Sequence, residues 1–98
     1  MFSEVFYLLR SKQDGKYLVA NIENKIHEKE SFLFVFQENF DALGYINHHS
    51  PEYKDLFIVE SLSFSQLKLL LSRWGFSGIG IVEDILIPKI KFCKIEQS

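Results

Sequence analysis

LSFSQLKLLLSRWGFSGIGIV, from Leu62 to Val82, is the stretch that decides the fold, because it contains one complete helix that leads directly into a strand. Ser63 and Gln66 have the spacing of a capping box, in which each side chain binds the free backbone N–H at the other position. At the far end, Gly75 can adopt the left-handed conformation that closes a helix. The two end signals together predict a helix from Phe64 to Trp74.

This predicted helix has one apolar and one polar face at about 100° per residue. Leu69 breaks the pattern, because it projects from the polar side. It is either a lone apolar residue with no role or part of a contact with a partner, since arginine and aromatic residues beside it are favoured in interface hot spots. The candidate partner-binding residues are Leu69, Arg73, Trp74 and Phe76. The predicted buried face comprises Phe64, Leu67, Leu70, Leu71 and Trp74.

Composition indicates one domain over residues 1–98 with a sizeable core, because 47% of the 98 residues are hydrophobic and ten are phenylalanine. The formal net charge of −2 provides no basic field for a nucleic acid, so none is expected as a partner. The single cysteine, Cys93, excludes an internal disulfide and is typical of a reducing compartment.

The first residues, Met1-Phe2-Ser3-Glu4, lack the basic region and apolar run of a signal peptide. No apolar stretch approaches the length that spans a bilayer. We therefore expect a cytoplasmic protein without a membrane partner.

The first part of the chain predicts a β-hairpin. Strands are expected at about Val5 to Lys12 and Lys16 to Asn21, joined by a type I′ turn at Asp14-Gly15. A helix over residues 3–12 is the alternative. The polar run Asn21 to Glu30 is expected to form a solvated loop.

Ser31 to Phe36 is apolar without alternation, which is typical of a strand covered on both faces. A second helix is expected from Phe40 to His48, with Asn39 as its cap, a stop at Ser50-Pro51 and a close approach of another backbone at Gly44. Its predicted buried residues are Phe40, Leu43 and Ile46.

The remaining strands are expected at Asp55 to Glu60, Ile79 to Glu83 and Lys89 to Ile95, with Pro88 before the last and that strand at an edge. The order is then β-β-β-α-β-α-β-β. The fold class is α+β: a single domain with a mixed sheet of about five or six strands and two helices packed on one face.

None of the catalytic motifs fits. Gly75, Gly78 and Gly80 follow a helix and precede a strand, the reverse of a phosphate-binding loop, so they are interpreted as structural glycines. His48 and His49 are adjacent and point about 100° apart on a helix, so they are not expected to chelate one metal ion. No cofactor, metal or catalytic residue is therefore expected, and a non-catalytic domain is favoured over an enzyme.

The pattern FLFVFQENFDAL (residues 32–43), followed by a second apolar strand, a capped leucine-rich helix and a closing strand, resembles the SseB family of enhanced-serine-sensitivity domains. The resemblance covers about residues 31–92, and the turn WGFSGIG replaces a proline-containing turn of that pattern. It implies a small non-catalytic domain of undefined cellular role, with no catalytic residues to carry over.

Two hypotheses for function follow. The first is a protein-interaction or regulatory module that binds another protein, or itself, through the outer face of the helix at residues 64–74 and the turn after it. The alternative is a small-molecule-sensing domain or minor enzyme, with a pocket between the 21–30 loop and the sheet that uses His27 or Glu28. A homodimer joined along Lys89 to Ile95 is a third possibility, although lysines at a sheet edge oppose such pairing.

Overall fold

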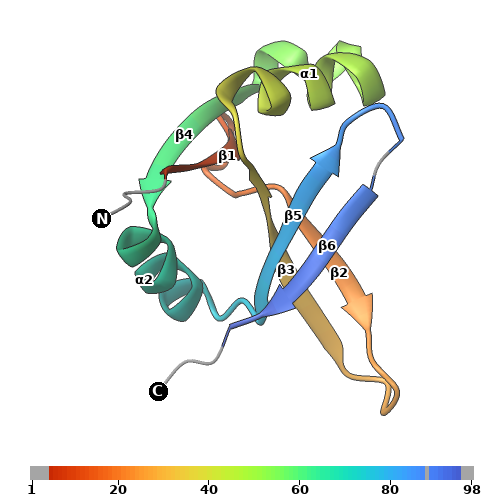
Figure 1. The fold of residues 1–98 in the computed structure, drawn as a ribbon, viewed down its shortest axis with the longest axis vertical. Coiled ribbons are helices and arrows are strands. Elements are labelled where there is room, and N and C mark those ends of the chain that lie inside the picture. The colour runs from red at the N-terminus through yellow and green to blue at the C-terminus, as the bar shows by residue number, and fades with distance from the viewer. Residues whose placement is uncertain (1–4, 88, 96–98) are drawn as a thin grey trace.

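The computed structural model describes residues 5–87 and 89–95, which form one α+β domain around an open, six-stranded mixed sheet (Figure 1). The strand order is β4-β1-β3-β5-β6, and β2 pairs with β3 beside β1. The predicted fold class, sheet and element order are confirmed. The elements are β1 Val5–Ser11, β2 Val19–Glu23, β3 Lys29–Phe36, α1 Asn39–His49, η1 Pro51–Leu56, β4 Phe57–Ser63, α2 Phe64–Trp74, β5 Gly78–Asp84 and β6 Lys89–Lys94.

Strand β3 is the centre of the sheet, and its residues 32–36 are all buried. It pairs in parallel with β5 on one side and antiparallel with β1 and β2 on the other. Leu18 lies where β1 gives way to β2: its N–H donates to Leu9 O at 2.9 Å, and its carbonyl accepts from Phe34 N at 3.1 Å. The prediction of a strand covered on both faces is confirmed.

The prediction that both helices pack on one face is wrong, because α1 and α2 lie on opposite faces. Successive side chains of a strand point to opposite faces. Leu8 packs in a core cluster with residues of α2, whereas Leu9 packs in a second cluster with residues of α1. The topology explains this arrangement. Helix α1 lies in the connection from β3 to β4 and α2 in the connection from β4 to β5, and these two connections run in opposite directions across the sheet. Because both crossovers have the same handedness, the two helices must cover opposite faces.

Helix α2 has the predicted bounds and both predicted ends. Gln66 N donates to Ser63 Oγ at 3.3 Å and Ser63 N to Gln66 Oε1 at 2.9 Å, which completes the capping box. Gly75 has φ +71°, and the N–H of Phe76 donates to Leu71 O at 2.9 Å, as in a Schellman motif.

On the buried face of α2, Leu67 and Leu71 are fully buried. Phe64 and Trp74, which were predicted on the same face, are 49% and 39% exposed. They lie at the first and last positions of the helix, where their rings contact Phe6 and Tyr17 respectively and stay partly exposed. Leu69 is 69% exposed, as predicted.

Helix α1 differs from its prediction at its cap and its face. Its N-cap is Glu38, which makes no side-chain cap bond, so Asn39 is the first helical residue rather than the cap. The buried residues are Ala42 and Ile46, whereas Phe40 and Leu43 are 69% and 52% exposed. Ala42 allows the helix to lie close to β3, and this orientation turns the two larger side chains outward. The predicted stop at Ser50 is confirmed.

Two turns also differ from prediction. Among the residues around the first turn only Gly15 has a positive φ, whereas a type I′ turn needs two; the loop is instead closed where Ser11 N donates to Lys16 O at 2.8 Å. The predicted hairpin is wrong as well, because β1 and β2 are joined by an isolated bridge between Arg10 and Tyr17 instead of a ladder, and β2, at Val19–Glu23, pairs with β3. The run from Asn21 to Glu30 is the end of the β2–β3 hairpin instead of a long loop, closed where Asn24 N donates to Glu28 O at 2.9 Å.

The alternative helix over residues 3–12 is excluded for residues 5–11, which are strand, and residues 3 and 4, like Pro88, lie outside the described residues.

Three glycines mark close approaches or special backbone. A Cβ on Gly78 would lie 2.0 Å from Cys93 O in the paired strand β6, and one on Gly44 would lie 2.8 Å from the side-chain Cδ1 of Ile85. A Cβ on Gly75 would meet nothing within 4 Å. The close approach predicted at Gly44 therefore involves a side chain of the β5–β6 turn instead of a backbone.

The difference between the two faces of α2 can be tested with a matched pair of leucines. Leu71→Ala is expected to lower the free energy of unfolding by about 2 to 5 kcal/mol, because it opens a cavity in a fully buried cluster. Leu69→Ala, on the exposed face of the same helix, is expected to change it by less than about 0.5 kcal/mol. Urea denaturation followed by circular dichroism measures both, and equal losses would contradict the described packing.

Candidate partner-binding site beside strand β4

The two end strands of the main sheet order, β4 and β6, differ in how they are protected, while β2 pairs only with β3. β6 carries three exposed lysines, Lys89, Lys91 and Lys94, and the last binds Glu30 through Nζ and Oε2 at 2.9 Å. Lysines on an edge strand oppose pairing with another chain. β4 has no lysine or proline, and it pairs with β1 over seven consecutive residues without a bulge. Among the described residues no strand pairs with its outer side, so β4 is the less protected of the two end strands.

A groove of about 190 Å³ runs between β4 and α2. The residues that α2 contributes recur at intervals of three and four, the spacing of one stripe along a helix. Leu69 is one of them, so it continues this stripe at the rim of the groove. The groove is lined by Glu60, Leu62, Gln66, Leu69, Leu70 and Arg73.

The carboxylate of Glu60 is fixed by two neighbours. Its Oε1 accepts a hydrogen bond from the Tyr17 hydroxyl at 2.6 Å, and its Oε2 forms an ion pair with Arg10 Nη1 at 3.2 Å. Arg10 also donates from Nε to Gly15 O at 2.9 Å and lies 5.0 Å from the centre of the Tyr17 ring. Glu60 therefore already has a cationic partner inside the domain.

Tyr17 is held in its neutral form by this arrangement. Burial, the hydrogen bond to Glu60 and the negative charge of Glu60 together raise the pKa of Tyr17 to about 12, against the opposing effect of Arg10. Because the phenol stays protonated at neutral pH, it remains a donor to Glu60.

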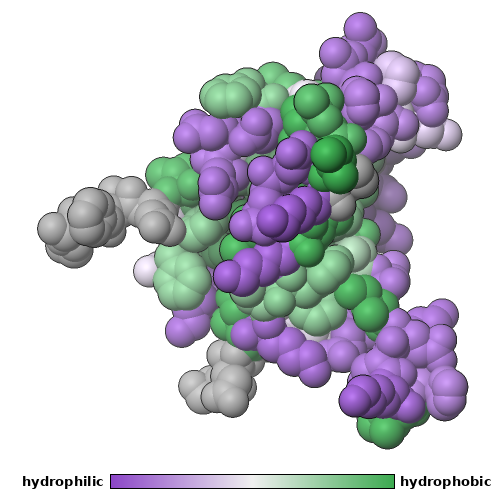
Figure 2. Space-filling view, turned by 45° about the vertical axis from the view of Figure 1, so that its right-hand side comes forward, coloured by the Kyte–Doolittle hydropathy of each residue, from purple (hydrophilic) through white to green (hydrophobic). Residues whose placement is uncertain are grey.

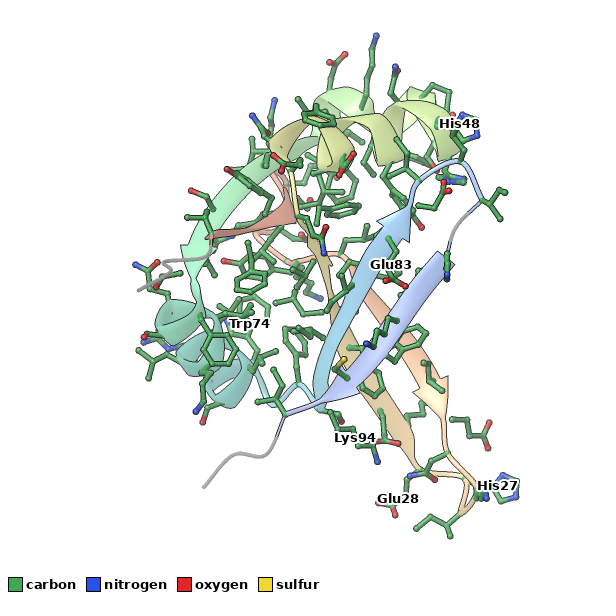
Figure 3. The ribbon with its side chains drawn as sticks, viewed as in Figure 1. His27, Glu28, His48, Trp74, Glu83 and Lys94 are labelled. Atoms are coloured by element: carbon green, nitrogen blue, oxygen red, sulfur yellow. The ribbon has the colours of Figure 1, made fainter. Side chains whose placement is uncertain are left out.

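The four residues predicted from the sequence divide into two pairs. Leu69 and Arg73 line the groove. Trp74 and Phe76 are absent from its lining: the Trp74 ring packs edge-on against Tyr17 at 5.3 Å between centroids and lies 5.9 Å from the Phe76 ring. Trp74 thus lies at the end of α2 (Figure 3), and its ring contact joins the helix to Tyr17.

Sequence reasoning missed the residues that strand pairing brings to the groove, namely Glu60 and Leu62, and the supporting residues Arg10 and Tyr17. Nothing local in the sequence relates Arg10 to Glu60, because their contact depends on the β1–β4 pairing. Gln66 and Leu70 could have been found from the helical stripe that contains Leu69.

The two residues of the alternative pocket hypothesis, His27 and Glu28, are both exposed. Both lie at the tip of the β2–β3 hairpin, far from the two helices (Figure 3), on a part of the surface that is mostly hydrophilic (Figure 2). His27 has φ +64°, and its Nδ1 lies 2.7 Å from Glu23 Oε1 in an exposed pair. The hairpin tip projects away from the two helices (Figure 3).

No cluster of three or more potential metal ligands occurs within residues 5–87 and 89–95. None of the helices in the same part of the chain is both long and apolar enough to cross a membrane. Comparisons with family models, curated proteins and solved structures found no match to this chain.

The bond between Tyr17 and Glu60 can be tested by titration. Glu60→Gln is expected to lower the pKa of Tyr17 from about 12 towards 10.0, because it removes the negative charge beside the phenol. The chemical shift of ring-labelled tyrosine Cζ measures this pKa. Tyr45 is the internal control, since its pKa is raised by burial alone. An unchanged pKa of Tyr17 in the variant would contradict the interaction.

The same shift makes stability depend on alkaline pH. The folded pKa of Tyr17 is above the unfolded value of 10.0, so the folded state keeps a proton that the unfolded state has lost. The stability contributed by the protonated phenol is fully present below about pH 10 and is lost as the pH rises to about 12.

Proposed function

We propose that this domain binds another protein by accepting an extended segment of it as an added strand along β4. The observation that carries the proposal is the less protected end strand directly beside a groove formed with a helix. In strand addition the backbone hydrogen bonds supply affinity, and a pocket for alternate side chains supplies specificity. A role as a non-catalytic interaction or regulatory module follows from this mode of binding.

The groove indicates the chemistry of the partner segment. Alternate side chains of an added strand face the same side, so those above α2 would contact Leu62, Leu69 and Leu70. Arg73 makes no ion pair among the described residues, whereas Glu60 is already paired. We therefore infer a segment with alternating apolar residues and an acidic residue that reaches Arg73.

Pairing with another protein is favoured over pairing between two copies. In a symmetric antiparallel β4–β4 pair centred on the strand, the two Glu60 residues would lie opposite each other, and like charges at opposed positions are unfavourable. A pair along β6 would bring its lysines together in the same way. These charges oppose both forms of self-association.

The proposal agrees with what the resemblance to the SseB family implies, a small domain without catalytic residues. A cytoplasmic location is part of the proposal, and the single cysteine, Cys93, which is half-buried and unpaired, supports it. The expected partner is therefore an intracellular protein.

A selection of random ten-residue peptides displayed against the whole chain tests this function. Enriched peptides are expected to alternate apolar residues and to contain an acidic residue, and the best of them is expected to shift the amide resonances of β4 and α2. Leu69→Glu and Arg73→Glu should each weaken its binding at least about tenfold, which corresponds to about 1.4 kcal/mol.

Lys68→Glu is the matched control. Like Arg73→Glu, it replaces a positive charge on α2 with a negative one, but Lys68 lies outside the groove lining. It is expected to leave the affinity nearly unchanged. Equal effects of Lys68→Glu and Arg73→Glu, or shifts confined to other elements, would overturn the groove as the binding site. If the protein forms a dimer in sedimentation experiments and Leu69→Glu dissociates it, the groove binds a second copy of this chain instead of another protein.

A further inference from the structure

A second and larger cavity, of about 360 Å³, lies on the opposite face of the sheet, at the C-terminal half of α1. Its size is within the range of pockets that hold small molecules. Three elements and the β1–β2 connection contribute to it, and none of its residues belongs to the groove beside α2. The cavity is lined by Leu18, Tyr45, Ile46, His49, Ser50, Tyr53 and Phe57.

The walls of this cavity are mainly aromatic, and no residue of the lining is an aspartate, glutamate, lysine or arginine. A ligand with a full charge would therefore lose water without meeting a carboxylate, lysine or arginine partner, which is unfavourable. Flat aromatic rings pack against one another in offset or edge-on arrangements. The lining thus favours an uncharged, planar molecule.

Aromatic residues of β3 and α1 hold the ring of Tyr45, which forms one wall of the cavity. Its ring lies 5.9 Å from the Phe34 ring and 5.5 Å from the Phe36 ring, both of which are buried residues of β3. It also lies 4.6 Å from the ring of His49, one turn further along α1. Burial raises the pKa of Tyr45, so its hydroxyl is a hydrogen-bond donor at neutral pH.

His49 supplies an acceptor. Its Nε2 lies 2.6 Å from the carbonyl oxygen of Ile85, and because a carbonyl can only accept, Nε2 carries the hydrogen. In the neutral ring the other nitrogen, Nδ1, is then an acceptor. The same bond ties the β5–β6 turn to α1, where Ile85 also packs against Gly44.

We propose that this cavity binds a small, uncharged, planar aromatic molecule that has a hydrogen-bond donor on its edge. The aromatic walls would enclose the ring, and its donor would meet the hydroxyl oxygens or the imidazole acceptor at the lining. This site is independent of strand addition at β4, because the two sites share no lining residue.

Indole is the probe for this proposal, because it is neutral and planar and has one N–H donor. Titration of the isotope-labelled whole chain is expected to give saturable amide shifts centred on the C-terminal half of α1, η1 and Leu18. Indole-3-acetate has the same ring but carries a carboxylate, so it is expected to bind at least about tenfold more weakly.

Tyr53→Ala is expected to weaken indole binding at least about fivefold, because it removes one aromatic wall. Tyr53 is 50% exposed, so the variant should keep the fold, which thermal unfolding checks. Phe40→Ala, on α1 but outside the lining, is the control and should leave the affinity unchanged. Leu69→Glu should also leave it unchanged, which separates this site from the groove.

Three results would overturn the proposal: shifts that spread over the surface without saturating, equal affinities for indole and indole-3-acetate, or equal effects of Tyr53→Ala and Phe40→Ala. If Tyr53→Ala lowers stability, Tyr53→Phe and Tyr53→Leu provide a second comparison. The phenylalanine variant keeps the ring and should bind indole more tightly than the leucine variant, and the reverse order would contradict an aromatic wall.

Discussion

The burial of β3 on both faces is the constraint on which the rest of the structure depends. Leu33 and Val35 belong to the cluster that includes α2, whereas Phe34 and Phe36 belong to the cluster that includes α1. One strand therefore anchors both helices through alternating side chains. Because the chain crosses the sheet in one direction after β3 and returns after β4, the two helices cover opposite faces. In the described residues, every buried side-chain polar atom has a hydrogen-bond partner.

The two candidate sites are consequences of this arrangement, and β4 takes part in both. Phe57, at its start, lines the aromatic cavity on the α1 face, whereas Glu60 and Leu62 line the groove on the α2 face. A strand at the end of a sheet with a helix on either side has two side-chain faces and one open backbone edge. The domain can thus present two chemically different surfaces, one suited to an extended peptide and one to a planar molecule.

Local signals predicted the bounds and both ends of α2, because its cap and its Schellman motif lie within one short segment, but they did not predict the exposure of Phe64 and Trp74 at its ends. The order of elements and most of the strands were also predictable from apolar runs, but β2 begins and ends later than expected, at Val19–Glu23, inside the polar run that was interpreted as a loop. The placement of the helices was not predictable, since it depends on sheet order. For the same reason the cluster of Arg10, Tyr17 and Glu60 was missed, while Leu69 and Arg73 were found only because an exposed leucine interrupts a regular helical pattern.

The glycines that follow α2 differ in which side chains could replace them, and this determines which substitutions the fold can tolerate. Gly75 faces open space and is constrained only by its positive φ, so asparagine, which tolerates that backbone region, is an acceptable replacement. Gly78 faces the carbonyl of Cys93, and no side chain of any chemistry fits there without separating β5 from β6. A search for distant relatives, or a redesign of this chain, should therefore hold position 78 invariant and leave position 75 open to substitution.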